Sequence, residues 1–180
     1  MQLTEGYHCL KPMAAKLLFE QWVPHSKAIV FRFFSDLQNL PRLMPSERQT
    51  QVGHLSLIPA PSGEPAGPGS EFTVSFRPLP PLPFRAQWTA RIVALGHESF
   101  FEDIQSQGPF RHWRHRHEFA SETREGIDGT LVRDRIEIDL GWSVAGWIAG
   151  RLLVIPELRR TFAERQNLLS RILAEIPEQA

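Results

Sequence analysis

The most informative stretch for the fold is Gly108–Phe119, which reads Gly-Pro-Phe-Arg-His-Trp-Arg-His-Arg-His-Glu-Phe. After the Gly-Pro turn, the alternation of a strand places an aromatic and histidine set on one face: Trp113, His115, His117 and Phe119. The opposite face holds only polar or charged residues: His112, Arg114, Arg116 and Glu118. We therefore expect the first face to point inward. Because buried imidazoles need hydrogen-bond partners or bound water, the pattern predicts a polar patch within an otherwise apolar cavity.

Length and composition indicate a single folded domain. The chain has 180 residues, 42% of them apolar, and five tryptophans, which is typical of a globular protein with a substantial core. Residues 1–12 show no clear periodicity. We therefore expect an N-terminal extension over residues 1–12 and one ligand-binding domain over residues 13–180.

Charge and cysteine content exclude several classes of protein. Lys plus Arg number 20 and Asp plus Glu number 20, so the net charge is zero and a nucleic-acid partner is not expected. Cys9 is the single cysteine, which excludes a disulfide framework and favours a reducing compartment. Glu5 and Lys11 interrupt any signal-peptide core, and no apolar run approaches the roughly 20 residues that span a bilayer. We expect a cytoplasmic protein with no membrane span.

The N-terminal half begins with one strand and a helical region. Lys16–Val23 is expected to form a strand, and Ser26 is a suitable N-cap for a helix over Lys27–Leu37. Pro41 and Pro45 then divide the following segment into a short second helix or turns.

Six further strands and a long helix follow. β-branched and aromatic residues between turn signals predict the histidine strand and five others: Arg48–Ile58, Ser70–Phe76, Phe84–Val93, Ser99–Gln107 and Thr130–Leu140. Apolar residues at steps of three, four or seven predict a helix over Val144–Ile176, interrupted at Pro156. The expected class is α+β, a curved antiparallel sheet covered by the C-terminal helix.

Three stretches of the chain carry a resemblance to a known superfamily. The first runs from Val23-Pro24 through Phe31-Arg-Phe-Phe-Ser-Asp-Leu-Gln-Asn-Leu to Pro45. The second joins Phe101-Glu-Asp-Ile-Gln to the Gly-Pro-Phe turn and the Trp-x-His-x-His-x-Phe strand, and the third joins Asp134-Arg-Ile-Glu to Leu158-Arg-Arg-Thr-Phe-Ala-Glu-Arg. Together they resemble the START-like or Bet v 1-like (SRPBCC) superfamily over about residues 17–173, and most closely its bacterial ligand-binding or cyclase/dehydrase-like members.

The resemblance implies a helix-grip fold, in which a seven-stranded antiparallel sheet wraps around the C-terminal helix. It also implies a cavity for lipids, isoprenoids, polyketides or similar apolar molecules. It does not decide whether the protein is a catalyst, because transporters, cyclases, quinone chaperones and regulators share the fold.

The strand pairing predicts where carboxylates meet the histidines. If the Gly108-Pro109 turn joins neighbouring strands, Asp103 lies opposite His115 and Gln105 opposite Trp113, with Cβ atoms about 4.5–5.5 Å apart. If the next turn centres on Glu125-Gly126, Asp134 lies opposite His117. Asp128-Gly129 is an equally good turn dipeptide, so this second register stays open.

Four interpretations of this polar cluster remain open. It could be a structural network, the polar end of a binding pocket, an acid–base centre, or a metal site of two histidines and a carboxylate. We adopt the pocket, with no cofactor and no metal. The expected ligand-binding residues are Trp88, Phe101, Asp103, Gln105, Trp113, His115, His117, Phe119, Asp134 and Phe162.

The function predicted from the sequence is binding of a hydrophobic or amphipathic small molecule by a carrier, sensor or chaperone. The protein would act as a monomer or a homodimer. The alternative is a polyketide cyclase/aromatase-like or dehydratase-like enzyme, with His115, His117 and Asp134 as candidate catalytic residues. A third class, an interaction module without a cavity, would instead have Trp88, Trp113 and Phe162 packed into a closed core.

Overall fold

The computed structural model describes residues 14–80, 82–140, 148 and 150–176. Seven strands form one antiparallel sheet in the order β1-β7-β6-β5-β4-β3-β2. The strands are β1 (Ala14–Val23), β2 (Gln51–Ser56), β3 (Glu71–Phe76), β4 (Ala86–Gly96), β5 (Phe100–Gln107), β6 (His112–Arg124) and β7 (Ile127–Asp139). Strands β2 to β7 lie next to one another in the sheet in their sequence order, and β1 pairs with β7 to form the other edge strand.

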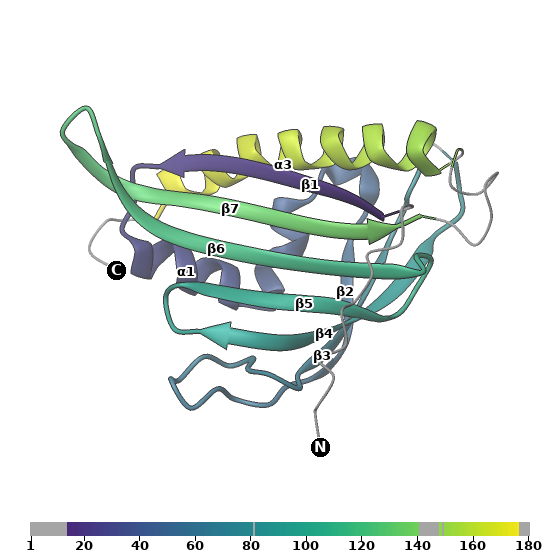
Figure 1. Cartoon of the computed structure of the whole chain (residues 1–180), viewed down its shortest axis with the longest axis horizontal. Helices are drawn as coiled ribbons and strands as arrows, with labels where there is room; N and C mark the ends of the chain where they lie inside the picture. Colours follow the sequence, from purple (N-terminus) through teal and green to yellow (C-terminus); the bar gives the residue numbers. More distant parts are fainter. Residues whose placement is uncertain (1–13, 81, 141–147, 149, 177–180) are drawn as a thin grey trace, which may run out of the picture.

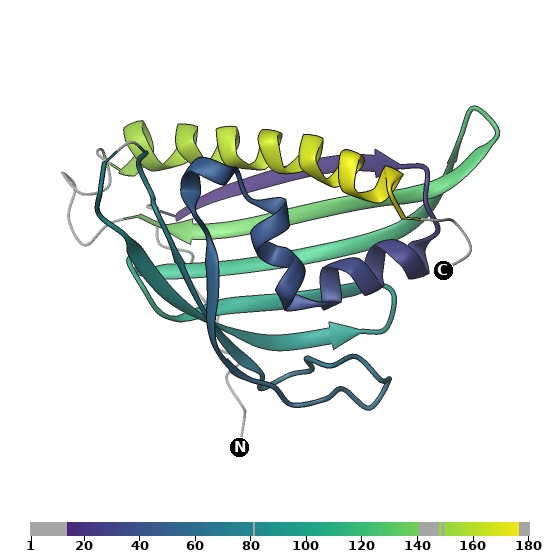
Figure 2. The same cartoon turned by 180° about the vertical axis from the view of Figure 1, so that it is seen from behind.

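The helices lie on the concave face of the sheet. Between β1 and β2 the chain forms α1 (Lys27–Ser35) and two 3₁₀ helices, η1 (Leu37–Leu43) and η2 (Ser46–Arg48). The Ser26 hydroxyl accepts a hydrogen bond from the Ile29 amide and so caps α1 as expected. This segment crosses the concave face from one edge of the sheet to the other, beside the long helix α3 (Ile155–Ala174), as Figure 2 shows.

The expected helix-grip fold is therefore confirmed (Figure 1). The expected interruption at Pro156 takes the form of a π-helical segment, η3 (Gly150–Val154), directly before α3. Pro156 then lies in the first turn of α3, where the missing amide hydrogen has no intrahelical partner to lose. Residues 141–147 and 149, part of which we expected to be helical, lie outside the described residues.

Two of the strand boundaries that differ from the expectation have a clear local cause. β2 begins at Gln51, because Arg48 belongs to η2 and is buried there. β7 begins at Ile127, because the hairpin turns at Glu125-Gly126, where φ is +51° and +78°. Positive φ at both central residues is the signature of a tight two-residue hairpin turn, and it fixes the register of β6 on β7.

The core occupies the space between the concave face and the helices. Phe31, Phe34 and Phe119 pack together where α1 meets β6, and Leu169 and Leu173 of α3 cover them. A second cluster joins α3 to the β1, β6 and β7 edge through Leu17, Trp113, Ile136, Ile138 and Phe162. Within the described residues, no helix is long and apolar enough to cross a membrane.

Candidate functional site

The inward face of β6 carries the aromatic and histidine set identified in the sequence. Trp113, His115, His117 and Phe119 are all buried, whereas the residues between them are more exposed. This alternation follows from the pleat of a strand whose other face meets solvent. The two imidazole rings lie with their centroids 3.9 Å apart on the concave side.

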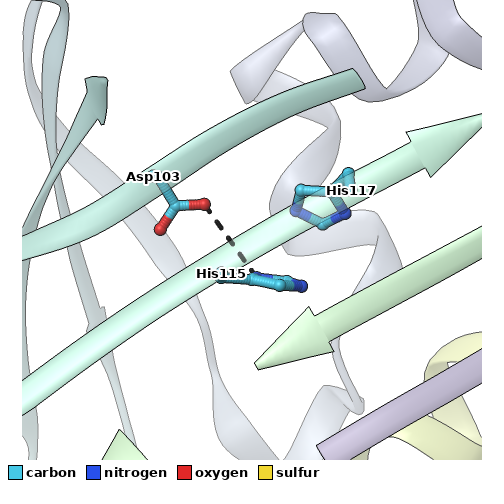
Figure 3. Close-up of side chains that lie close together, drawn as sticks. All are labelled: Asp103, His115 and His117. Atoms are coloured by element: carbon cyan, nitrogen blue, oxygen red, sulfur yellow. Dashed lines mark ion pairs between the residues drawn. The ribbon is translucent and has the colours of Figure 1, made fainter. Parts of the chain in front are cut away.

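Both expected carboxylates lie next to these histidines. Asp103 on β5 pairs with His115, and Asp134 on β7 pairs with His117. Asp103 Oδ2 is 3.9 Å from His115 Nδ1, the contact drawn in Figure 3. That distance is too long for a hydrogen bond, so the interaction between the two groups is electrostatic.

Asp134 is the carboxylate that organises the histidine pair. Its Oδ1 accepts a hydrogen bond from His115 Nε2 at 3.0 Å and also lies 2.5 Å from His117 Nδ1. The second contact is close but poorly aligned for a hydrogen bond. His115 therefore lies between two carboxylates, with its Nε2 bonded to Asp134 and its Nδ1 facing Asp103.

A buried arginine, which the sequence analysis missed, joins the cluster from the helix side. Arg165 of α3 is 8% exposed, and its guanidinium Cζ lies 5.1 Å from the Phe162 ring centroid and 5.6 Å from that of Phe34. The signal was present in the sequence. Arg165 follows Phe162 by three positions and precedes Leu169 by four, so it falls on the apolar face of the helix.

The pKa values of three groups reflect burial and this arginine. Burial raises the pKa of Asp103 to about 6, against the opposing influence of His115 and Arg165. Burial and the neighbouring His115 lower the pKa of His117 to about 3, so this imidazole is neutral. Although burial alone would raise the pKa of Asp134, His117, Arg165 and the hydrogen bond from His115 hold it well below its usual range.

The cluster forms part of the wall of a cavity of about 580 Å³ between the sheet, the η1 segment and α3. This volume lies within the range of small-molecule sites, roughly 300–1,000 Å³. Seven of the ten residues expected to bind ligand line the cavity. They are Trp88, Phe101, Asp103, Trp113, His115, His117 and Phe162.

The other three expected residues do not line the cavity. Gln105 donates from Nε2 to the Phe110 carbonyl at 2.8 Å and so closes the β5–β6 turn. Phe119 packs against Phe31 and Phe34 in the core, at ring distances of 5.4 and 5.3 Å. Asp134 contacts the imidazoles of His115 and His117 and does not itself line the cavity.

A second buried arginine, also missed, lies at another part of the cavity wall. The Arg48 guanidinium donates to Thr161 Oγ1 at 2.8 Å, forms an ion pair with Glu157, and donates to the backbone carbonyls of Arg77 and Pro78. It therefore ties η2 and the β3–β4 connection to the first turns of α3. Its partners are 29 to 113 residues away in the sequence, so no local pattern marks it.

Asp103, His115 and His117 also have the composition of a metal site. Each offers one ligand atom, and these atoms lie within 4.8 Å of one another. Two histidines and one carboxylate are a known ligand set for transition metals. However, Arg165 brings a permanent positive charge close enough to alter the pKa values of Asp103 and His117, which disfavours a cation at this place.

Comparisons with known proteins identify the class of fold. No protein-family model and no curated protein sequence matches the chain. Among solved structures, the protein TTHA0849 from Thermus thermophilus is similar over 90% of this chain and 100% of its own, with a TM-score of 0.65 and 17% identity.

Two further structures extend the comparison. Ara h 8.0201 is similar over 90% of this chain and 99% of its own, with a TM-score of 0.58 and 13% identity. The major latex-like protein 151 of Panax ginseng is similar over 81% of this chain and 95% of its own, with a TM-score of 0.53 and 14% identity. The chain thus shares the fold of these structures, the helix-grip fold expected from the sequence.

Proposed function

We propose that the protein binds a hydrophobic or amphipathic small molecule in the cavity between the sheet and α3, as a carrier, sensor or chaperone. The observation that carries the proposal is the cavity itself, about 580 Å³ in volume, with a mainly apolar wall and one polar cluster. A largely apolar concavity with a few convergent polar groups is the usual composition of a small-molecule site. The third class considered, an interaction module without a cavity, is not supported by a cavity of this volume.

The arrangement of side chains supports a pocket with two chemically different parts. Aromatic groups such as Trp88, Trp113 and Phe162 offer surface to an apolar body. Asp103 and His115 offer polar atoms to a headgroup. Burial of apolar ligand surface would supply most of the affinity, and the polar cluster would fix the orientation of the ligand.

A cyclase/aromatase-like or dehydratase-like activity is the second candidate. The specific observation in its favour is the 3.0 Å hydrogen bond from His115 Nε2 to Asp134, on a histidine that also lines the cavity. A carboxylate that orients an imidazole is a common arrangement for a general base. Turnover of a poly-β-keto substrate that is lost in His115→Gln would favour this candidate over simple binding.

Binding of a neutral fluorescent probe tests the proposed function. N-phenyl-1-naphthylamine should bind the wild-type protein with an increase in fluorescence. Val74 lines the cavity, so Val74→Phe should fill part of it and weaken binding at least tenfold. Val93 is 38% exposed on β4, so Val93→Phe is a matched control that should leave binding unchanged. Absence of binding to the wild type, or equal affinity of both variants, would contradict the proposal.

A further inference from the structure

We propose that the molecule bound in the cavity is an apolar acid whose carboxylate is held by the guanidinium of Arg165. This inference rests on the proposed function, because it names the chemical class of the ligand for the same cavity. It starts from a single unusual feature, a buried cation that faces the cavity without a bonded partner.

Arg165 is that cation. Its side chain lines the cavity and is largely shielded from solvent, yet it makes no hydrogen bond or ion pair with any described residue. An arginine side chain is always charged and carries five N–H donors. The other buried arginine at the cavity wall, Arg48, has both of its terminal nitrogens engaged by Glu157, Thr161 and two backbone carbonyls, and only its Nε is without an acceptor. A buried charge without such partners is costly, so a ligand that supplies an anion would stabilise it.

Two aromatic rings hold the Arg165 head in place. Phe162 and Phe34 approach its Cζ to 5.1 and 5.6 Å, within the range of cation–π contacts. Such contacts hold the guanidinium without using its N–H groups. The donors therefore remain available to an acceptor in the cavity, and their fork matches the two oxygens of a carboxylate.

Arg165 has carboxylates nearby but no bonded anion among the described residues. Its charge helps to lower the pKa of Asp134 and opposes the rise in the pKa of Asp103, yet Asp134 is bonded to His115 and neither carboxylate forms a hydrogen bond or ion pair with Arg165. Asp103 faces His115 from β5, with Glu102 beside it and Arg165 opposite, and it can become uncharged by binding a proton because its pKa is about 6. Arg165 is the one described cation of the cluster without a bonded partner, which favours a singly charged carboxylate over a phosphate group.

Paired probes that differ only in charge test this inference. We would measure displacement of N-phenyl-1-naphthylamine by dodecanoate against dodecan-1-ol, and by 1-naphthoate against 1-naphthylmethanol. In the wild type, at least one acid should bind about tenfold or more tightly than its alcohol. Arg165→Gln should weaken that acid roughly ten- to a hundredfold, the size expected for loss of a charge-assisted hydrogen bond, and should affect the alcohol and the dye much less.

Arg159 provides the matched control. It lies on the exposed side of the same helix, so Arg159→Gln removes the same charge without touching the cavity and should leave every affinity unchanged. If Arg165→Gln does not fold by circular dichroism, Arg165→Lys keeps the charge and loses the fork, and should show a reduced preference for the acid.

The outcomes separate the two proposals. If the dye binds but each acid and its alcohol bind equally to the wild type, or if Arg165→Gln weakens both alike, the acid ligand is wrong and the binding function stands. If the dye and all four probes fail to bind the wild type, both proposals are wrong.

Discussion

Removal of the Asp103 charge should change how stability depends on pH. Its pKa is about 6 in the folded protein against 3.8 for the ordinary side chain, because it is buried. A raised pKa means that the folded state binds the proton more tightly, so the stabilisation is complete below pH 4 and is lost as pH rises through 6. About two pH units at 1.36 kcal/mol each correspond to a loss of up to about 3 kcal/mol.

The substitution Asp103→Asn removes this titration and keeps the size of the side chain. Urea unfolding at pH 4, 5, 6, 7 and 8 should therefore show the variant gaining on the wild type by up to about 3 kcal/mol from pH 4 to pH 8. His117 acts in the opposite sense. Its folded pKa is lowered to about 3, so its contribution is lost as pH falls below 6.5. It is present in both proteins, so it cancels in their difference.

Gln107 offers a control for this experiment. It is exposed at the end of the same strand, and Gln107→Asn removes no titratable group, so its difference from the wild type should stay nearly constant with pH. A flat difference for Asp103→Asn, or one that favours the wild type as pH rises, would refute the reasoning. Asp103 would then be a solvated or fully paired carboxylate rather than a buried one with a raised pKa.

Three further predictions concern the cluster, the second arginine and the core. His115→Gln should weaken binding of cavity probes roughly ten- to a hundredfold with the fold intact. Asp134→Asn should instead lower the free energy of unfolding by about 1–3 kcal/mol, with a smaller effect on affinity. Unchanged affinity in a folded His115→Gln would show that the site is placed wrongly. Arg48→Met should lower the free energy of unfolding by about 1–3 kcal/mol, because Glu157 and two carbonyls lose their donor. Arg32→Met, on the exposed side of α1, should have little effect. Equal melting temperatures for the two variants would contradict the role of Arg48 in joining η2 to α3. Leu169→Ala should lower the free energy of unfolding by about 2–5 kcal/mol, because Leu169 is 2% exposed and packs beneath α1. Leu152 is 69% exposed, so Leu152→Ala should have little effect in the same denaturation assay. Similar losses for the two variants would mean that α3 does not pack as described.

The fold was predictable because the decisive signals are local. Alternation along β6 fixed which side chains face inward, and the spacing of apolar residues fixed α3. The one ambiguous register depended on which dipeptide formed the turn. Glu125-Gly126 makes the turn, and Asp128 instead accepts a hydrogen bond from Thr123 across the hairpin.

The site was only partly predictable, because its remaining parts depend on contacts between distant segments. Arg165 faces the cluster only because α3 packs against the β1, β6 and β7 side of the concave face, whereas its spacing in the sequence places it on the apolar face of the helix without saying what that face meets. Phe119 and Gln105 share the inward face of their strands with cavity residues, yet α1 covers the first and the β5–β6 turn engages the second. Periodicity identifies a face, but the packing of helices on that face decides which residues meet a ligand.

Native mass spectrometry of the protein purified from its own host tests the central claim most directly. The account predicts a wild-type mass with an added small molecule that organic extraction recovers, and little or none of this adduct on Val74→Phe, whose cavity is partly filled. A clean apo mass for the wild type, or the same adduct on both proteins in equal amount, would contradict ligand binding in the cavity between the sheet and α3.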